Sequence, residues 1–115
     1  MIIRQFDIWL ANLNPAGGTV PGKIRPVLVV QTNNLNKVGH PSTIILPLTT
    51  DIFKDSELLR INLMPDFENG LEKDSAIIID QIRAIDNNKF IKKIGQVSLS
   101  LHQRIKQLIA IVLGL

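Results

Sequence analysis

The sequence predicts a mainly β fold of the α+β type, an antiparallel barrel of five to seven short strands packed by one C-terminal helix. Short β-rich runs alternate with turns rich in Gly, Pro and Asn over most of the chain, and a helical spacing of apolar residues appears only near its end. The chain has 115 residues, the size of one ordinary domain, and 45% of them are hydrophobic, which is enough to form a core. We therefore expect a single domain that spans residues 1–115.

Two strands joined by a long loop are expected first. Residues 6–12 alternate in polarity and are rich in β-forming types, as in a half-buried strand. Residues 14–22 contain two prolines and three glycines, which is typical of a loop. Residues 27–30 read Val-Leu-Val-Val, an apolar run that indicates a strand buried on both faces. Pro26 takes the first position of that strand, where no hydrogen-bond donor is lost inside the sheet.

Two further strands follow a second loop. Residues 33–42 are polar and contain a glycine and a proline, so they predict a loop. Residues 43–49 predict a third strand, and Pro47 within it indicates a bulge or a sheet edge. Residues 58–63 alternate apolar and polar side chains, which indicates a half-buried strand.

The next segments predict two more strands separated by turns. Asn69-Gly70 is a strong turn signal. Residues 75–83 contain the apolar run Ala-Ile-Ile-Ile followed by Asp-Gln, which predicts another buried strand. Residues 86–88 indicate a turn, and residues 90–97 a last strand with Gly95 at a bulge.

One amphipathic helix is expected to close the chain. Ser100 with Gln103 fits a capping box, and Ser98 fits a cap equally well, so both starts stay open. Gly114 is expected to end the helix. One apolar stripe follows the helical period and comprises Leu101, Ile105, Leu108, Ile109 and Val112.

Composition excludes several classes of protein. The chain has no cysteine, which removes disulfides, thiolate nucleophiles and cysteine-ligated metals. The longest uncharged apolar run, residues 108–115, is far shorter than the roughly 20 residues of a membrane helix. Residues 51–86 carry nine acidic and four basic side chains, whereas residues 87–115 carry five basic and no acidic ones. The net charge of +3 suggests an anionic partner, and we expect a cytoplasmic protein.

The motifs of most common enzyme classes are missing. His40 and His102 have no histidine or acidic neighbour at the spacing of metal ligands, so we expect no metal and no cofactor. The sequence has no phosphate-binding glycine loop and no serine-nucleophile motif. Polar residues remain where buried strands end: Arg25 before one, Thr49 after another and Asp80 after a third. An arginine fork and a hydroxyl together can hold a phosphate.

Four segments in order carry a resemblance to a known family. They are Asp7-Ile8-Trp9 with Asn14-Pro15, Gly22-Lys23-Ile24-Arg25-Pro26-Val27, Ile44-Ile45-Leu46-Pro47-Leu48-Thr49, and Asp80-Gln81-Ile82-Arg83-Ala84-Ile85. In these segments the chain resembles the MazF/PemK/Kid toxins of bacterial toxin–antitoxin systems, which are sequence-specific endoribonucleases. The resemblance covers nearly the whole chain and implies a small SH3-like β-barrel with a C-terminal helix, working as a homodimer.

The resemblance also implies a reaction. Such enzymes cut single-stranded RNA without a metal, by attack of a ribose 2′-hydroxyl on the adjacent phosphorus. Arg25 would neutralise the charge that develops on the phosphorane and could shuttle a proton, and Thr49 would hold a non-bridging oxygen of the scissile phosphate. Donors placed where charge develops are usually the largest catalytic term.

The proton transfer has a second candidate. In some relatives the carboxylate of the Asp-Gln motif is a proposed base, which falls on Asp80 as a third catalytic residue. Those relatives have an arginine where this chain has Ile78 and a histidine where it has Thr19. The alternative role of Asp80 is to orient Gln81 or to hold Arg83.

RNA is expected to enter between two polar segments, residues 15–24 and 51–56, because single-stranded RNA is read by splayed bases against loops. Phe53 in the second segment offers an aromatic surface on which a base can stack; burial of this ring in the core is the competing interpretation. The residues expected to contact RNA are Thr19, Lys23, Thr50, Phe53 and Gln81.

The expected partners are single-stranded RNA, a second copy of the chain and a cognate antitoxin whose acidic tail would cover the basic groove. Two alternatives stay open: a CcdB-like toxin that poisons gyrase on the same fold, and an inactive RNA-binding barrel. CcdB-like chains end in Trp-Gly-Ile, whereas this one ends in Leu-Gly-Leu. Its only tryptophan, Trp9, is assigned to the core or to a dimer contact.

Overall fold

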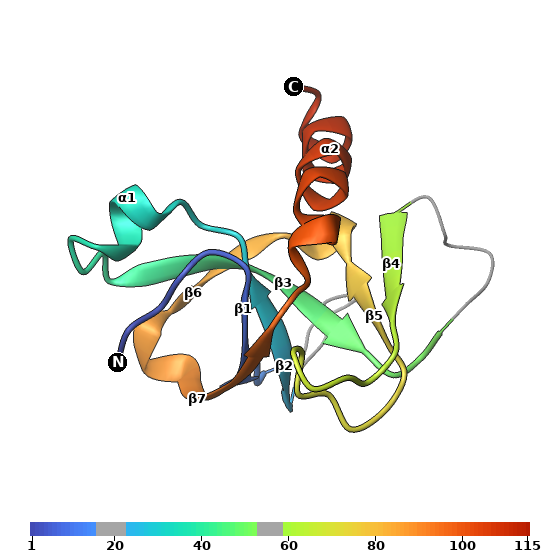
Figure 1. Ribbon diagram of the computed structural model, residues 1–115. Coiled ribbons are helices and arrows are strands. Elements are labelled where there is room, and N and C mark those ends of the chain that lie inside the picture. The colour runs from blue at the N-terminus through green and yellow to red at the C-terminus, as the bar shows by residue number, and fades with distance from the viewer. Residues whose placement is uncertain (16–22, 53–58) are drawn as a thin grey trace.

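The computed structural model describes residues 1–15, 23–52 and 59–115 of the chain (Figure 1). The molecule consists of a strongly curved antiparallel sheet and a C-terminal helix that stands above it. The strands are β1 (Asp7–Asn12), β2 (Ile24–Val29), β3 (Ser42–Thr49), β4 (Arg60–Leu63), β5 (Ser75–Ile78), β6 (Arg83–Asp86) and β7 (Phe90–Gln96). The helices are α1 (Asn33–Asn36) and α2 (His102–Leu113), with short 3₁₀ turns η2 (Ile79–Gln81), η3 (Asn87–Lys89) and η4 (Leu99–Leu101).

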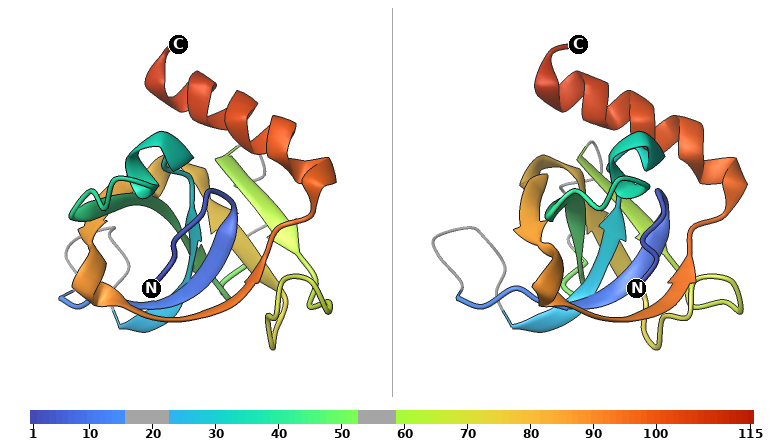
Figure 2. Two further views of the ribbon diagram at one scale, coloured as in Figure 1. Left: turned by 60° about the vertical axis from the view of Figure 1, so that its left-hand side comes forward. Right: turned by 90° about the vertical axis from the view of Figure 1, so that its left-hand side faces the viewer.

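The strands form one sheet in the order β4-β5-β3-β2-β1-β7, and β6 pairs with β3 beside this path. Every pair is antiparallel. Figure 2 shows the sheet curling around a central core, with α2 lying across one side. Among the described residues no pairing joins β4 to β7, so the barrel is open at this seam. The expected antiparallel β fold with a C-terminal helix is confirmed.

Strand β3 organises the sheet because it changes partners along its length. One of its edges pairs with β2. The other pairs first with β6, up to Ile45, and then with β5, from Leu48 onward. Pro47 lies in the interval between these two partners, so its missing N–H removes no ladder bond there. This local edge agrees with the interpretation of Pro47 from the sequence.

Three expectations from the sequence were wrong. Residues 33–42 are not wholly a loop, because α1 forms one helical turn whose start is capped by the Thr32 hydroxyl, which accepts from the Asn34 N–H. Residues 75–83 are not one strand, because η2 interrupts the apolar run and the chain continues as β6 against the other half of β3. Pro26 also lies inside β2, opposite Leu10, and not at its first position.

The core has two layers, and β2 contributes to both. Leu28 packs with Ile8 and Leu46 on the side that α2 covers, whereas Val27 and Val29 pack on the other side with Trp9. All three β2 residues are fully buried, which explains their continuous apolar run. Trp9 is buried, so the expectation of a core role is confirmed.

The C-terminal helix closes the first core layer. Ser98 is the cap, since its hydroxyl accepts from the Ser100 N–H at the start of η4. Ile105 and Leu108 are the buried members of the expected apolar stripe. Gly114 ends α2 in the left-handed conformation. No helix in the described part of the chain is long and apolar enough to cross a membrane.

Candidate active site

The antiparallel pairing of β2 and β3 brings Arg25 and Thr49 together. Val27 lies opposite Pro47 in this pair. Continuing the same register by two residues places Arg25 opposite Thr49, at the end of both strands. The two side chains line one cleft of about 240 Å³. A guanidinium and a hydroxyl that are 24 residues apart in the sequence therefore share one site.

The Arg25 guanidinium is held against the end of β3. Its Nη1 donates a hydrogen bond of 3.1 Å to the main-chain oxygen of Leu48. Burial lowers the pKa of Arg25 below its ordinary value; the nearby Asp51 carboxylate raises the pKa, and the Arg83 cation lowers it again. The side chain is half-buried, so its outer face can still reach a ligand in the cleft.

The Thr49 hydroxyl is oriented by the turn that follows β3. Its Oγ1 accepts a hydrogen bond of 3.1 Å from the backbone N–H of Asp51. Because the oxygen acts as the acceptor in this bond, the O–H proton can point to another acceptor, such as a phosphate oxygen. Thr49 is therefore a positioned donor at the mouth of the cleft.

Lys23 stands at the same mouth, at the neck of the loop between β1 and β2. Its backbone has a positive φ of 56°. Its N–H donates to the side-chain oxygen of Asn14 at 2.6 Å, and its carbonyl oxygen accepts from Leu13 at 2.9 Å. These two bonds fix the chain at the point where the exposed Lys23 side chain lines the cleft.

Of the other residues expected to contact RNA or to act in catalysis, the structure places one in the cleft. Thr50 is exposed and lines the cleft, as expected for a contact residue. Thr19 and Phe53 lie outside the described residues. Asp80 and Gln81 are not among the residues that line the cleft. They lie on η2, beyond the far end of β5 and against α2.

Two cleft residues had no role assigned from the sequence. Asp51 follows the strand-end Thr-Thr pair and lines the cleft with a carboxylate. Its position two residues after Thr49 was a usable signal, because residues that follow a strand end lie near its last side chains. Ser75, at the start of β5, also lines the cleft. No local pattern marks Ser75, since it reaches the site only through the pairing of β5 with β3.

The donor set of the cleft suits an anion better than a cation. Among the described residues of the cleft, Lys23, Arg25 and Thr49 offer protons to a ligand, and Asp51 supplies a carboxylate. In residues 1–15, 23–52 and 59–115, no three His, Cys, Asp or Glu side chains are grouped as metal ligands would be. The arrangement can bind a phosphodiester by charge-assisted hydrogen bonds.

Comparison with known proteins agrees with this type of site. A family model described as the PemK-like, MazF-like toxin of type II toxin–antitoxin systems matches residues 4–113. The chain belongs to this family of toxins.

Two curated relatives extend over almost the whole chain. Endoribonuclease EndoA of Bacillus subtilis is 30% identical over 115 residues, which is 100% of this chain and 97% of the relative. Endoribonuclease MazF of Staphylococcus saprophyticus is 32% identical over 114 residues, 99% of this chain and 93% of the relative.

A solved structure shows the same fold at lower sequence identity. It is an endoribonuclease in complex with its cognate antitoxin from a mycobacterial species, with a TM-score of 0.77 and 18% identity. The match covers 98% of this chain and 96% of the other. The arrangement of sheet and C-terminal helix is therefore that of the family.

Proposed function

We propose that this endoribonuclease toxin cleaves single-stranded RNA in the cleft between Arg25 and Thr49, by attack of a ribose 2′-hydroxyl on the adjacent phosphorus. The observation that carries the proposal is the convergence of these two side chains from paired strands on one cleft. A phosphodiester placed there meets a bidentate cation and a neutral donor on two sides.

Arg25 and Thr49 act on the charge that develops in the reaction. As the 2′-oxygen bonds to phosphorus, negative charge grows on the two non-bridging oxygens. The Arg25 guanidinium neutralises this charge, and the Thr49 hydroxyl donates to one of the oxygens. Both groups are held by bonds to the main chain of β3 and its following turn, so little reorganisation is needed during the step. A metal ion is not required in this scheme, because Arg25 and Lys23 supply the positive charge.

The proton of the 2′-hydroxyl goes to a carboxylate. Asp51 is the carboxylate that lines the cleft among the described residues, so we assign this role to Asp51 in preference to Asp80. The bond from phosphorus to the 5′-oxygen then breaks, and the 5′-oxygen takes a proton from water. The products are a 2′,3′-cyclic phosphate and a 5′-hydroxyl.

The proposal includes the partners of the family. A cognate antitoxin would lay an acidic segment across the cleft and neutralise Lys23 and Arg25. A second copy of the chain would form a homodimer, supported by the exposed apolar residues at the end of α2, which are Ile111, Leu113 and Leu115. The cytoplasm, where mRNA is available, is the proposed location.

The two alternative functions are not favoured. The family model and both curated relatives point to endoribonuclease toxins. A gyrase poison of the CcdB type needs a terminal aromatic wedge, whereas Trp9 is buried with only 6% of its surface exposed.

Cleavage of a long single-stranded RNA in the presence of EDTA tests the proposal. We expect fragments that end in a cyclic phosphate from the purified protein and a loss of more than about 100-fold in rate from Arg25→Ala. Lys37→Ala is the matched control, because Lys37 is an exposed cation on the far side of the fold, next to α1. Cleavage that EDTA abolishes, or that Arg25→Ala leaves intact, would overturn the proposal.

A further inference from the structure

A second hollow lies directly beside the cleft. Its volume is about 320 Å³, near the lower end of the roughly 300–1,000 Å³ of small-molecule sites. The hollow and the cleft share three lining residues, Pro26, Thr50 and Ser75. The cleft and the hollow therefore lie side by side, and together they extend from Arg25 across the sheet to β7.

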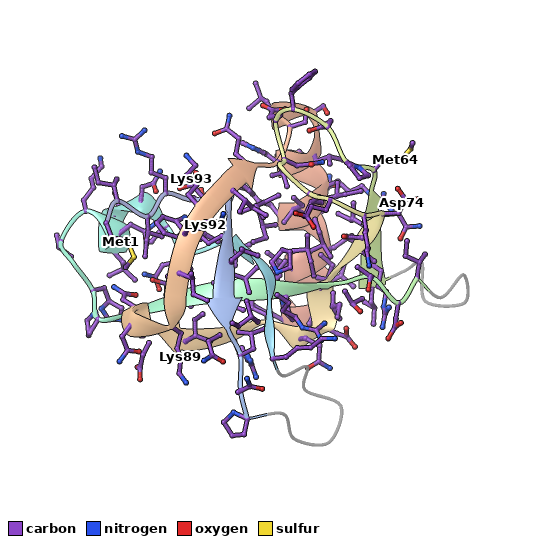
Figure 3. The ribbon with its side chains drawn as sticks, turned by 90° about the horizontal axis from the view of Figure 1, so that it is seen from below. Met1, Met64, Asp74, Lys89, Lys92 and Lys93 are labelled. Carbon is purple, nitrogen blue, oxygen red and sulfur yellow. The ribbon has the colours of Figure 1, made fainter. Side chains whose placement is uncertain are left out.

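The hollow has an apolar floor with a charged rim. The apolar surface comes from three strands and the segment before β5: Leu10 of β1, Pro26 of β2, Ile94 of β7, and Leu71. A rim of three charged side chains, Lys92, Lys73 and Glu72, surrounds it. Leu10 and Lys92 are direct partners across the β1–β7 pair, so their side chains lie on the same face of the sheet. Figure 3 shows Lys92 along β7, between Lys89 and Lys93.

One wall of the hollow, formed by residues 70–73 before β5, is fixed to β7. Gly70 and Gly95 pack so closely that a side chain at either would overlap the main chain of the other segment. The backbone N–H of Gln96 donates a hydrogen bond of 2.9 Å to the main-chain oxygen of Glu68. The buried Asn69 side chain accepts from Leu71 at 3.0 Å and donates to Met64 at 2.8 Å. A hollow with such walls exists before any ligand arrives, which reduces the entropy lost on binding.

We propose that this hollow binds the nucleobase of a nucleotide next to the scissile phosphate, with Lys92 and Lys73 neutralising the following phosphate. The inference rests on the proposed function and extends it to a site for substrate recognition. Proteins read single-stranded RNA by placing unstacked bases in apolar pockets beside backbone contacts. A phosphate-binding cleft beside an apolar hollow with two lysines at its rim has this pattern.

One member of the rim, Glu72, discriminates a base from an acidic side chain. Glu72 can accept a hydrogen bond from an exocyclic amino group or a ring N–H of a base. The same carboxylate repels the acidic side chains of an antitoxin tail. We therefore assign the hollow to RNA, and leave binding of an antitoxin peptide there as an outcome of the test.

The test uses an RNA that binds without being cut. Once primer extension has mapped a cleavage site, an oligonucleotide around that site is made with 2′-deoxyribose at the attacking position, which removes the nucleophile. Abasic residues are then placed one at a time on either side, and Kd is measured by fluorescence anisotropy with the full chain. We expect one neighbouring position at which loss of the base weakens binding about tenfold.

Two variants show whether that base occupies the hollow. Leu10→Phe fills the hollow and should remove most of the abasic penalty at that position only, with folding checked by circular dichroism. Lys92→Ala should weaken binding and reduce the slope of log Kd against log salt by about 0.7, as for one single-strand phosphate contact. Lys37→Ala is the control and should change neither quantity, since Lys37 lines neither the cleft nor this hollow.

Three results would overturn the inference. The first is an abasic penalty that is the same in Leu10→Phe as in the unmodified protein. The second is an unchanged salt slope in Lys92→Ala. The third is a result in which Leu10→Phe and Lys92→Ala weaken the binding of an acidic antitoxin peptide but leave the affinity for RNA unchanged. Failure of the proposed function is distinguishable, because it would appear in the cleavage assay, as a rate that EDTA abolishes or that Arg25→Ala leaves intact, whereas the binding measurements use an RNA that is not cut.

Discussion

The Nη1 group of Arg25 and the main-chain oxygen of Leu48 lie 3.1 Å apart in a hydrogen bond. Leu48 directly precedes Thr49, so this bond ties the guanidinium to the same strand end that carries the hydroxyl. The relative position of the two groups is therefore set by the backbone of β2 and β3. In the proposed reaction, the placement of the two donors around the phosphorus depends on this register.

Replacement of Arg25 by lysine separates charge from geometry. Arg25→Lys keeps a cation but loses the planar fork, so we expect kcat to fall by about 100-fold with a smaller change in KM. Burial and the Arg83 cation, which lower the pKa of Arg25, should also lower that of a lysine below its ordinary value of about 10.4. As pH rises through the lowered pKa the cation is lost, so the variant should lose activity at alkaline pH before the unmodified protein does. Single-turnover cleavage between pH 7 and 10, with an RNA-only blank, measures this. Superimposable pH profiles would contradict it.

Thr49→Val removes the hydroxyl while keeping a β-branched side chain of nearly the same shape. The variant loses the donor to the phosphate and the acceptor for the Asp51 N–H. We expect kcat to fall between about tenfold and 100-fold. Thr49→Ser is the control, because it restores the hydroxyl and should recover most of the rate. Equal rates for the valine and serine variants would show that the hydroxyl takes no part.

Two carboxylates compete for the proton-transfer role, and a matched pair of variants decides between them. Asp51→Asn should lower kcat by about 100-fold, because Asp51 lines the cleft. Asp80→Asn should change kcat less than about twofold, since Asp80 is exposed on η2 away from the cleft. Cleavage rates under single-turnover conditions provide the measurement. The reverse result would return the role to Asp80, where the family motif places it.

Most of the fold could be predicted because its signals are local. The continuous apolar run in β2 indicated burial on both faces, and the spacing of Ile105 and Leu108 indicated the buried face of α2. The prediction of one strand over residues 75–83 was wrong for a non-local reason. The division of this segment into β5, η2 and the start of β6 follows from the change of partner along β3, which no property of the segment itself encodes.

The site was predictable to the extent that its members end strands. Arg25 and Thr49 could be identified because paired antiparallel strands bring their ends together. Asp80 also follows a strand, but it lies on η2 and is not among the residues that line the cleft, so its catalytic role stays a prediction. The apolar hollow was not predicted, because Leu10, Leu71 and Ile94 come from three segments that meet only in the folded sheet.

Two glycines with nearly the same positive φ offer a final test of the architecture. Gly70 has φ +66° and Gly39 has φ +70°. An alanine Cβ at position 70 would overlap the main-chain oxygen of Ile94, whereas nothing lies within 4 Å of one at position 39. Gly39→Ala should therefore cost only the left-handed strain, about 1 kcal/mol in the free energy of unfolding. Gly70→Ala adds a backbone clash that neither segment can relieve without separating β7 from the wall of the hollow, so we expect a loss of about 3 kcal/mol or more. Urea denaturation of both variants gives the difference directly. Equal losses would mean that the wall is not packed against β7 as described.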